Sequence, residues 1–187
     1  MKSKHNTIAT TLFAILSLGC FVTGAWAQTT QGTINAQLNN KSGISIVFNT
    51  DPSGVTLGNA GTSNATLNFG NISAYAPLSP RVSRPSVTAT NFTVSTPFDV
   101  RVVIRGTNSA NYTLNASLAA PATTGITYQV DTLTLTTAAQ TVTANGSYNT
   151  DVSHNLNLVV SKAAPGAGGP ATGTAISATL NFVATAN

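Results

Sequence analysis

Residues 98–106, FDVRVVIRG, decide the fold class of this 187-residue chain. Apolar side chains occupy every second position from Phe98 to Ile104, and the charged residues Asp99 and Arg101 stand between them. A repeat of two residues places successive side chains on opposite faces of a strand. The stretch therefore predicts a β-strand with one buried and one solvated face. On the solvated face, Asp99 and Arg101 are expected to form a local ion pair worth at most about 1 kcal/mol; a contact with a small ligand or partner, with Arg105 beyond them on the same face, is the alternative.

The same alternation recurs through most of the chain after residue 27. Strands are predicted at residues 32–38, 43–48, 65–70, 112–118, 126–130, 133–136, 154–161 and 176–184. Runs rich in glycine, proline and asparagine separate them, and the glycine-rich residues 162–173 are expected to form a hairpin loop before the last strand. Many short strands and no segment with a helical repeat predict an all-β, antiparallel, immunoglobulin-like β-sandwich. Residues 28–187 are expected to form it as a single domain.

The first 27 residues are interpreted as a cleaved secretory signal peptide. Lys2 and Lys4 precede an apolar run, and the small residues of the AWA motif at 25–27 predict cleavage before Gln28. The apolar run is shorter than the ~20 residues that span a bilayer. We therefore expect an exported protein of the periplasm, the cell surface or the extracellular medium, without a membrane span after cleavage. A lipoprotein signal at Cys20 is the alternative that the sequence leaves open.

Charge is scarce in this chain. Asp, Glu, Lys and Arg together make up 6% of the residues, and no glutamate occurs, whereas an ordinary domain is ~25% charged. The net charge of +4 thus reflects a shortage of acids rather than a basic patch, and nucleic-acid binding is not expected. The single cysteine, Cys20, lies in the predicted signal peptide, so the mature chain has no disulfide to stabilise it.

The chain offers few residues for catalysis. His154 is the one histidine after the signal peptide, no G-x-S-x-G motif occurs, and Asp51, Asp99, Asp131 and Asp151 stand apart in the sequence. A Ser-His-Asp triad would have to combine His154 with one of these aspartates, and an ordinary structural histidine is the favoured interpretation. We expect no enzyme activity, no cofactor and no metal site.

Two groups of residues are candidates for contact with a ligand or partner. The segment 77–85, PLSPRVSRP, predicts an extended, polyproline-like contact loop in which Arg81 and Arg84 are the only charges. A plain crossover between the sheets is the equal alternative. Tyr75 and Tyr148 stand in polar, turn-rich sequence, where their rings could stack on a sugar.

Strands at both ends of the predicted sandwich carry almost no charge. Sheet edges normally carry lysine, proline or bulges that prevent pairing with another chain. Residues 176–187 contain no charge, and the first predicted strands contain only Lys41. An end strand of one copy is therefore expected to fill a groove in another copy, by strand addition.

Several stretches resemble bacterial fimbrial subunits, in particular the spore-coat-U-type subunits of chaperone–usher systems. They are the signal peptide, QGTINAQLNNKSGISIVF at 31–48, LNFGNI at 67–72 and ATLNFVATAN at 178–187. The resemblance implies an incomplete sandwich that a periplasmic chaperone completes first, and that a donor strand from the next subunit completes after passage through an outer-membrane usher.

The resemblance also assigns roles to individual residues. It implies that residues 28–42 are a donor-strand extension, with Ile34, Ala36 and Leu38 as donor residues. It implies an acceptor groove lined by Ile176, Ala178, Leu180, Phe182 and Ala184. A related family of exported β-sandwich proteins would share the same features.

The sequence thus predicts a non-catalytic structural subunit of a bacterial surface fibre or coat, which self-associates by β-strand complementation. The alternative is a monomeric, secreted β-sandwich that binds a glycan or another surface ligand. In that case residues 28–38 would be the first strand of a complete sandwich.

Overall fold

The computed structural model describes residues 28–38, 43–106, 108–173 and 175–187. Within the first of these ranges, side chains are described for residues 31–35. The predicted signal peptide, residues 1–27, and Lys41 lie outside the described residues. The described part contains eleven β-strands and no helix. These are β1 (Gln28–Leu38), β2 (Ile44–Asn49), β3 (Asn64–Ile72), β4 (Ser83–Val87), β5 (Asn91–Ile104), β6 (Tyr112–Leu118), β7 (Ile126–Val130), β8 (Leu133–Thr134), β9 (Gln140–Gly146), β10 (Asp151–Ser161) and β11 (Ile176–Ala186).

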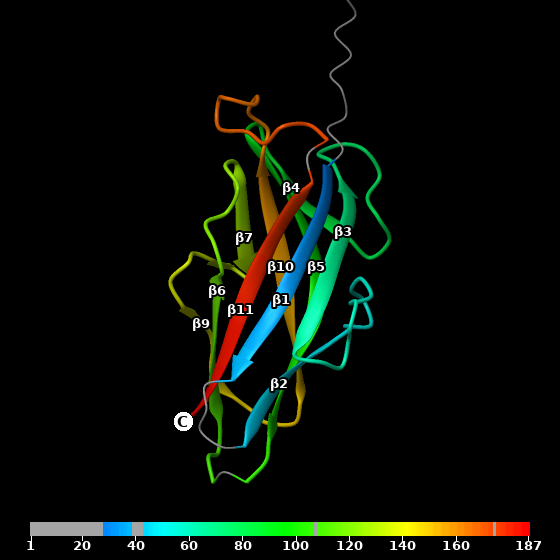
Figure 1. The fold of residues 1–187 in the computed structure, drawn as a ribbon. Helices are drawn as coiled ribbons and strands as arrows, with labels where there is room; N and C mark the ends of the chain where they lie inside the picture. The colour runs from blue at the N-terminus through cyan, green and yellow to red at the C-terminus, as the bar shows by residue number, and fades with distance from the viewer. Residues whose placement is uncertain (1–27, 39–42, 107, 174) are drawn as a thin grey trace, which may run out of the picture.

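The strands form two sheets that pack face to face (Figure 1). The front sheet has the order β3-β1-β11-β6-β9. The back sheet has the order β2-β5-β10-β7-β8, and β4 adds to it by pairing with β5. The protein is therefore all-β and built as a sandwich, as the alternating sequence predicted.

The apolar residues of the alternating strands meet between the two sheets. Phe98, Val100 and Val102 of the stretch FDVRVVIRG are fully buried. The ring of Phe98 lies 6.0 Å from that of Phe182 on β11, and Phe182 meets Phe48 on β2 edge-on at 5.3 Å between ring centroids. Because β11 belongs to the front sheet and the other two strands to the back sheet, this aromatic cluster joins the two layers.

The structure differs from the sequence prediction in two strands and one connection. Residues 83–87 form β4 rather than part of a polyproline-like loop, and they pair with β5 with a register shift after Ser83. Residues 140–146 form β9, for which no strand was predicted. The segment 162–173 is not a hairpin loop, because it connects β10 in the back sheet to β11 in the front sheet.

The expected ion pair between Asp99 and Arg101 does not form. Arg101 instead forms a two-pronged pair with Asp151 of the neighbouring strand β10, through its Nε and Nη2 atoms. Asn49 also donates to Asp151, over 2.7 Å. Side chains two residues apart on one strand are farther from each other than side chains on adjacent strands, so the cross-strand partner is favoured.

Tyr112 and Gly146 illustrate how closely the edge of the front sheet is packed. The two residues are paired across β6 and β9, and the fully buried Tyr112 ring covers the glycine. A methyl group at residue 146 would lie 2.1 Å from the Cζ atom of that ring. At Gly32 on β1, by contrast, an added methyl group would meet its nearest neighbour at 3.6 Å, an ordinary contact.

We predict that Gly146→Ala lowers the free energy of unfolding by about 1–3 kcal/mol, because an overpacked ring must move. Gly32→Ala is the matched control, and it should change that free energy by less than about 1 kcal/mol. Urea unfolding followed by tyrosine fluorescence measures both. Equal losses in the two variants would contradict the packing that the structure shows.

Candidate interaction site

The first strand, β1, occupies an internal position in the front sheet, between β11 and β3 (Figure 1). It pairs with β11 in parallel, from Thr30 opposite Ile176 to Leu38 opposite Ala184. It pairs with β3 antiparallel, with a register shift after Thr30. Every other pair of named strands in the described residues is antiparallel. We call the position that β1 fills, between β11 and β3, the β1 slot.

Inward-facing residues of β1 close the core from the front. Ile34 is fully buried, and Gly32 beside it is buried under the carbonyl of Leu67 on β3 and the side chain of Leu156 on β10. Burying an isoleucine side chain contributes about 1.5–3 kcal/mol. The side chains of the other two predicted donor residues, Ala36 and Leu38, lie outside the described part; the backbone register sets these residues opposite Phe182 and Ala184.

The residues predicted to line an acceptor groove lie on β11, directly beside β1. Ile176, Leu180, Phe182 and Ala184 are at most 3% exposed, and Ala178 is half-buried against the core. The structure thus brings the predicted donor segment and the predicted groove strand together within a single molecule. Sequence alternation alone carried no sign of this neighbour relation, because it does not report which strands pair.

The two arginines of the predicted contact loop have different environments. Arg84 is half-buried and holds the preceding loop, because its guanidinium donates to the carbonyl oxygens of Ser73, over 2.9 Å, and Ala76. Arg81 is exposed and has a φ of +65°, and its guanidinium makes one long hydrogen bond, of 3.3 Å, to the carbonyl of Gly54. Only Arg81 is therefore presented to a partner.

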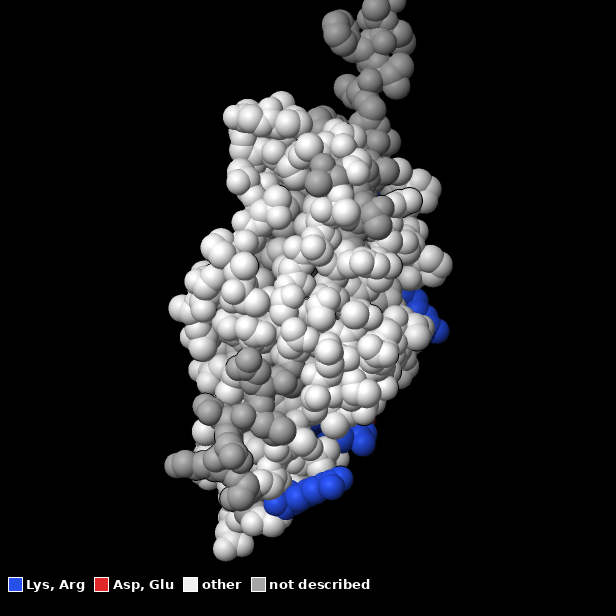
Figure 2. All heavy atoms as spheres, in the orientation of Figure 1, with Lys and Arg blue, Asp and Glu red and all other residues white. Residues whose placement is uncertain are grey.

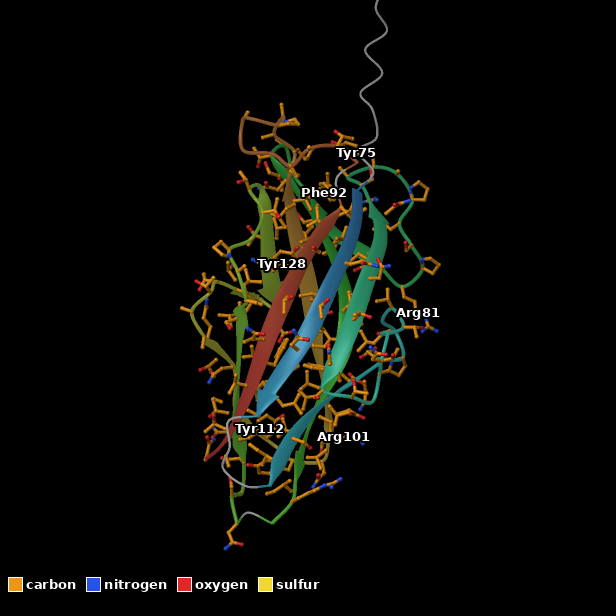
Figure 3. All side chains as sticks on the ribbon, in the orientation of Figure 1. Tyr75, Arg81, Phe92, Arg101, Tyr112 and Tyr128 are labelled. Atoms are coloured by element: carbon orange, nitrogen blue, oxygen red, sulfur yellow. The ribbon has the colours of Figure 1, made fainter. Side chains whose placement is uncertain are left out.

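The two tyrosines considered for sugar stacking do not form one surface with Arg81. Tyr75 is 68% exposed and lies at one end of the sandwich, where Lys162 donates to its hydroxyl over 2.7 Å and also lies over its ring (Figure 3). Tyr148 is half-buried, packs against Tyr112, and donates to the carbonyl of Asn111. A continuous sugar platform is therefore absent from these described residues.

His154 lies inside the sandwich rather than at its surface. It is 4% exposed, its ring packs near Phe98, and its Nδ1 atom lies 2.8 Å from Oδ2 of Asp131. Its Nε2 atom is buried and has no hydrogen-bond partner among the described residues. A triad requires that atom to contact a nucleophile, so this His–Asp pair positions the Asp131 turn instead.

Asp131 is held in a left-handed turn between β7 and β8, with a φ of +56°. Its second carboxylate oxygen, Oδ1, accepts the backbone N–H of Asn155 over 2.8 Å. Partial burial opposes ionisation of this carboxyl, but the bonds from His154 and Asn155 outweigh it and hold the pKa of Asp131 below its ordinary value. The turn therefore presents an ionised carboxylate.

A second group of aspartates, Asp51, Asp99 and Asp151, lies at and near the turn at residues 51–54. Asp51 accepts hydrogen bonds from Ser53 N–H and Oγ and from Ser153 Oγ, and the bonds from Ser53 are the main cause that lowers its pKa to about 2. Burial and the nearby carboxylates of Asp51 and Asp151 raise the pKa of Asp99. No group of three or more His, Cys, Asp or Glu residues in the described part is placed to hold a metal ion.

The outer face around β1 and β11 is neutral. Among the described residues, Figure 2 shows no Asp or Glu on this face, and Lys and Arg only along one rim. Its outward positions carry short polar side chains, set in rows by the strand register: Thr66, Thr33 and Thr179 in one row, and Asn64, Asn35, Asn181 and Ser117 in the next. The described surface around the β1 slot therefore carries no charges that would repel a second copy of the chain.

Comparisons with models of protein families and with curated protein sequences find no match for this chain. In the described residues no helix has the length and apolar character needed to cross a membrane.

We predict that Asp131→Asn lowers the free energy of unfolding by about 1 kcal/mol at neutral pH, since asparagine tolerates the left-handed turn but loses the charge that His154 faces. A carboxyl with a lowered pKa contributes its stability above the ordinary pKa of ~3.9 and loses it as pH falls through the lower folded value. The difference between wild type and variant should therefore shrink below about pH 4. Thermal unfolding at a series of pH values measures this, and a difference independent of pH would contradict the assignment.

Proposed function

We propose that this protein is a non-catalytic structural subunit of a bacterial surface fibre or coat, built on an immunoglobulin-like sandwich and assembled by β-strand complementation. One observation carries the proposal: β1, the segment that the sequence marks as a donor strand, fills an internal slot beside β11. The same segment of a second copy would make the same contacts in that slot.

The β1 slot has the chemistry needed to bind a strand. Without β1, the inner edges of β11 and β3 would expose unpaired N–H and C=O groups, and the space filled by Ile34 would open onto the core. Each restored backbone hydrogen bond contributes about 0.5–1.5 kcal/mol, and apolar burial adds to it. An incoming strand with alternating apolar side chains satisfies both requirements.

Exchange of β1 between copies requires little change in the contacts themselves. Residues 39–43 connect β1 in the front sheet to β2 in the back sheet. When β1 fills the slot of its own molecule the product is a monomer, and when it fills the slot of the next copy the product is a head-to-tail chain. Protein concentration decides between these two products.

Export and assembly partners complete the proposal. The predicted signal peptide at residues 1–27 supports transfer out of the cytoplasm, to the periplasm and then the cell surface or the medium. A subunit with an open slot exposes unpaired strand edges and aggregates, so a periplasmic chaperone would protect the slot until an outer-membrane usher adds the subunit to the fibre.

We predict that Ile34→Asp abolishes multimers that resist SDS, because it places an unpaired carboxylate in the core. Asn35→Asp is the matched control: it adds the same charge to the adjacent, outward-facing position of β1 and should leave assembly intact. Size-exclusion chromatography with light scattering, over a range of protein concentrations, and unheated SDS gels provide the readout. A wild-type protein that stays monomeric at every concentration would refute self-assembly.

We further predict that deletion of residues 28–38 gives a folded chain of lower stability that does not polymerise. Added peptide QTTQGTINAQL, which is the sequence of β1, should bind this variant and raise its unfolding temperature by several degrees, because it refills the slot. The same peptide with aspartate in place of isoleucine should have no effect. Unchanged assembly of the deletion variant would show that β1 is not the donor.

A further inference from the structure

A polar groove crosses the outer face of the back sheet, on the side of the sandwich opposite β1. Strand register aligns four of its side chains in one row: Ser83 on β4 opposite Ser95 on β5, Ser95 opposite Asn157 on β10, and Asn157 opposite Gln129 on β7. Three strand spacings make this row roughly 14 Å long. The groove has a volume of about 620 Å³.

The walls of the groove come from two irregular features. On one side, the register shift in β4 separates Ser83 from Ser86, and Pro85 and Ser86 line the groove there. On the other side stands the left-handed turn at Asp131 and Thr132. Both features depart from flat strand geometry, so they bound a surface that regular strands would leave open.

Hydroxyl and amide groups dominate the lining, and several of them have no partner within the described residues. Gln129 donates to Thr134 over 3.0 Å, and Asn157 donates to the carbonyl of Asp131, so the side-chain oxygens of both amides keep free acceptor capacity. Asn155 and Thr93 also line the groove, and neither side chain makes a hydrogen bond in the described structure. Ser95 is only 8% exposed, yet it belongs to the groove floor.

Asp131 is the one charged residue that lines the groove. Its carboxylate is fixed from below by the buried His154 and by the N–H of Asn155, while the side chain stays 42% exposed. It is therefore a pre-positioned acceptor of strong hydrogen bonds from hydroxyl groups. An anionic ligand would be repelled there, because no lysine, arginine or histidine lines the groove to balance the charge.

We propose that this groove binds a neutral saccharide chain. A row of hydroxyl and amide groups with both donor and acceptor capacity, ended by one carboxylate, matches a ligand that carries many hydroxyl groups and no negative charge. The lining holds no aromatic ring, so binding relies on hydrogen bonds between groove and ligand. These bonds replace the hydrogen bonds that both partners make with water before they bind. The affinity per site is therefore expected in the millimolar range.

The proposal is independent of the β1 slot, because the groove belongs to the other sheet and is complete in a single molecule. If the subunits also assemble into a fibre, each copy displays one groove. Many weak sites on one fibre would then bind a polysaccharide surface far more tightly than a single site does.

The test is an NMR titration of the ¹⁵N-labelled protein with neutral oligosaccharides (maltotriose, cellotriose and N-acetylchitotriose), with sialyllactose as the acidic probe and a Ser/Asn/Gln peptide as the non-sugar probe. At least one neutral oligosaccharide should give saturable shifts at groove residues, and neither other probe should. Asn155→Ala and Gln129→Ala should each weaken that binding about five- to tenfold, the loss expected for one or two hydrogen bonds. Asn181→Ala, which removes an outward amide from β11 on the opposite face, is the matched control and should leave the affinity unchanged.

Three results would overturn the proposal. The first is the absence of saturable shifts at the groove with every neutral oligosaccharide. The second is an equal or stronger response to the peptide or to sialyllactose. The third is a loss in Asn181→Ala as large as in the groove variants. A monomeric protein that binds sugar would refute fibre assembly alone, whereas a fibre with a silent groove would refute this inference alone.

Discussion

The pairing of β1 with β11 on one side and β3 on the other is the contact on which the front sheet depends. Among the named strands, β3 pairs only with β1, so the sheet would divide in two if β1 were absent. The back sheet would keep all its strand pairs but would lose the cover that Ile34 provides over the shared core. A chain without a disulfide has no covalent means to hold a divided sandwich together, and the strand that unites the sheet therefore determines whether the fold is complete.

Alternation of apolar residues predicted most strands and which face of each is buried, but not which strands are neighbours. Phe98 to Val102 are buried at every second position as expected, because burial on one face is a local property of the sequence. The sequence did not predict β9 because it is an edge strand whose exposed and half-buried residues do not alternate. It did not predict β4 because Pro85 and the register shift interrupt the regular strand pattern there. The parallel partner of β1 and the cross-strand partner of Arg101 depend on register between distant segments, which a period of two does not encode.

The two candidate surfaces follow from the same unusual composition. Outward strand positions filled with Ser, Thr, Asn and Gln leave the face around β1 neutral and give the groove on the back sheet its hydroxyl and amide lining. The row from Ser83 to Gln129 could not be identified from sequence, since its four members come from four strands, of which only β4 and β5 are consecutive in the chain. Asp131 shows the same limit: the sequence offers four aspartates that could contact His154, and it does not indicate that Asp131 is the one that does.

The ion pair between Arg101 and Asp151 is the one contact between a lysine or arginine and a carboxylate in the described part of the chain, and both side chains are about one-third exposed or more. Dissolved salt screens exposed ion pairs of this kind, so the described part of the sandwich contains little that screening could weaken. Its cohesion rests on apolar burial and strand pairing, which moderate changes in ionic strength leave largely unaltered. A protein of this kind is expected to keep the same fold in dilute and in saline water.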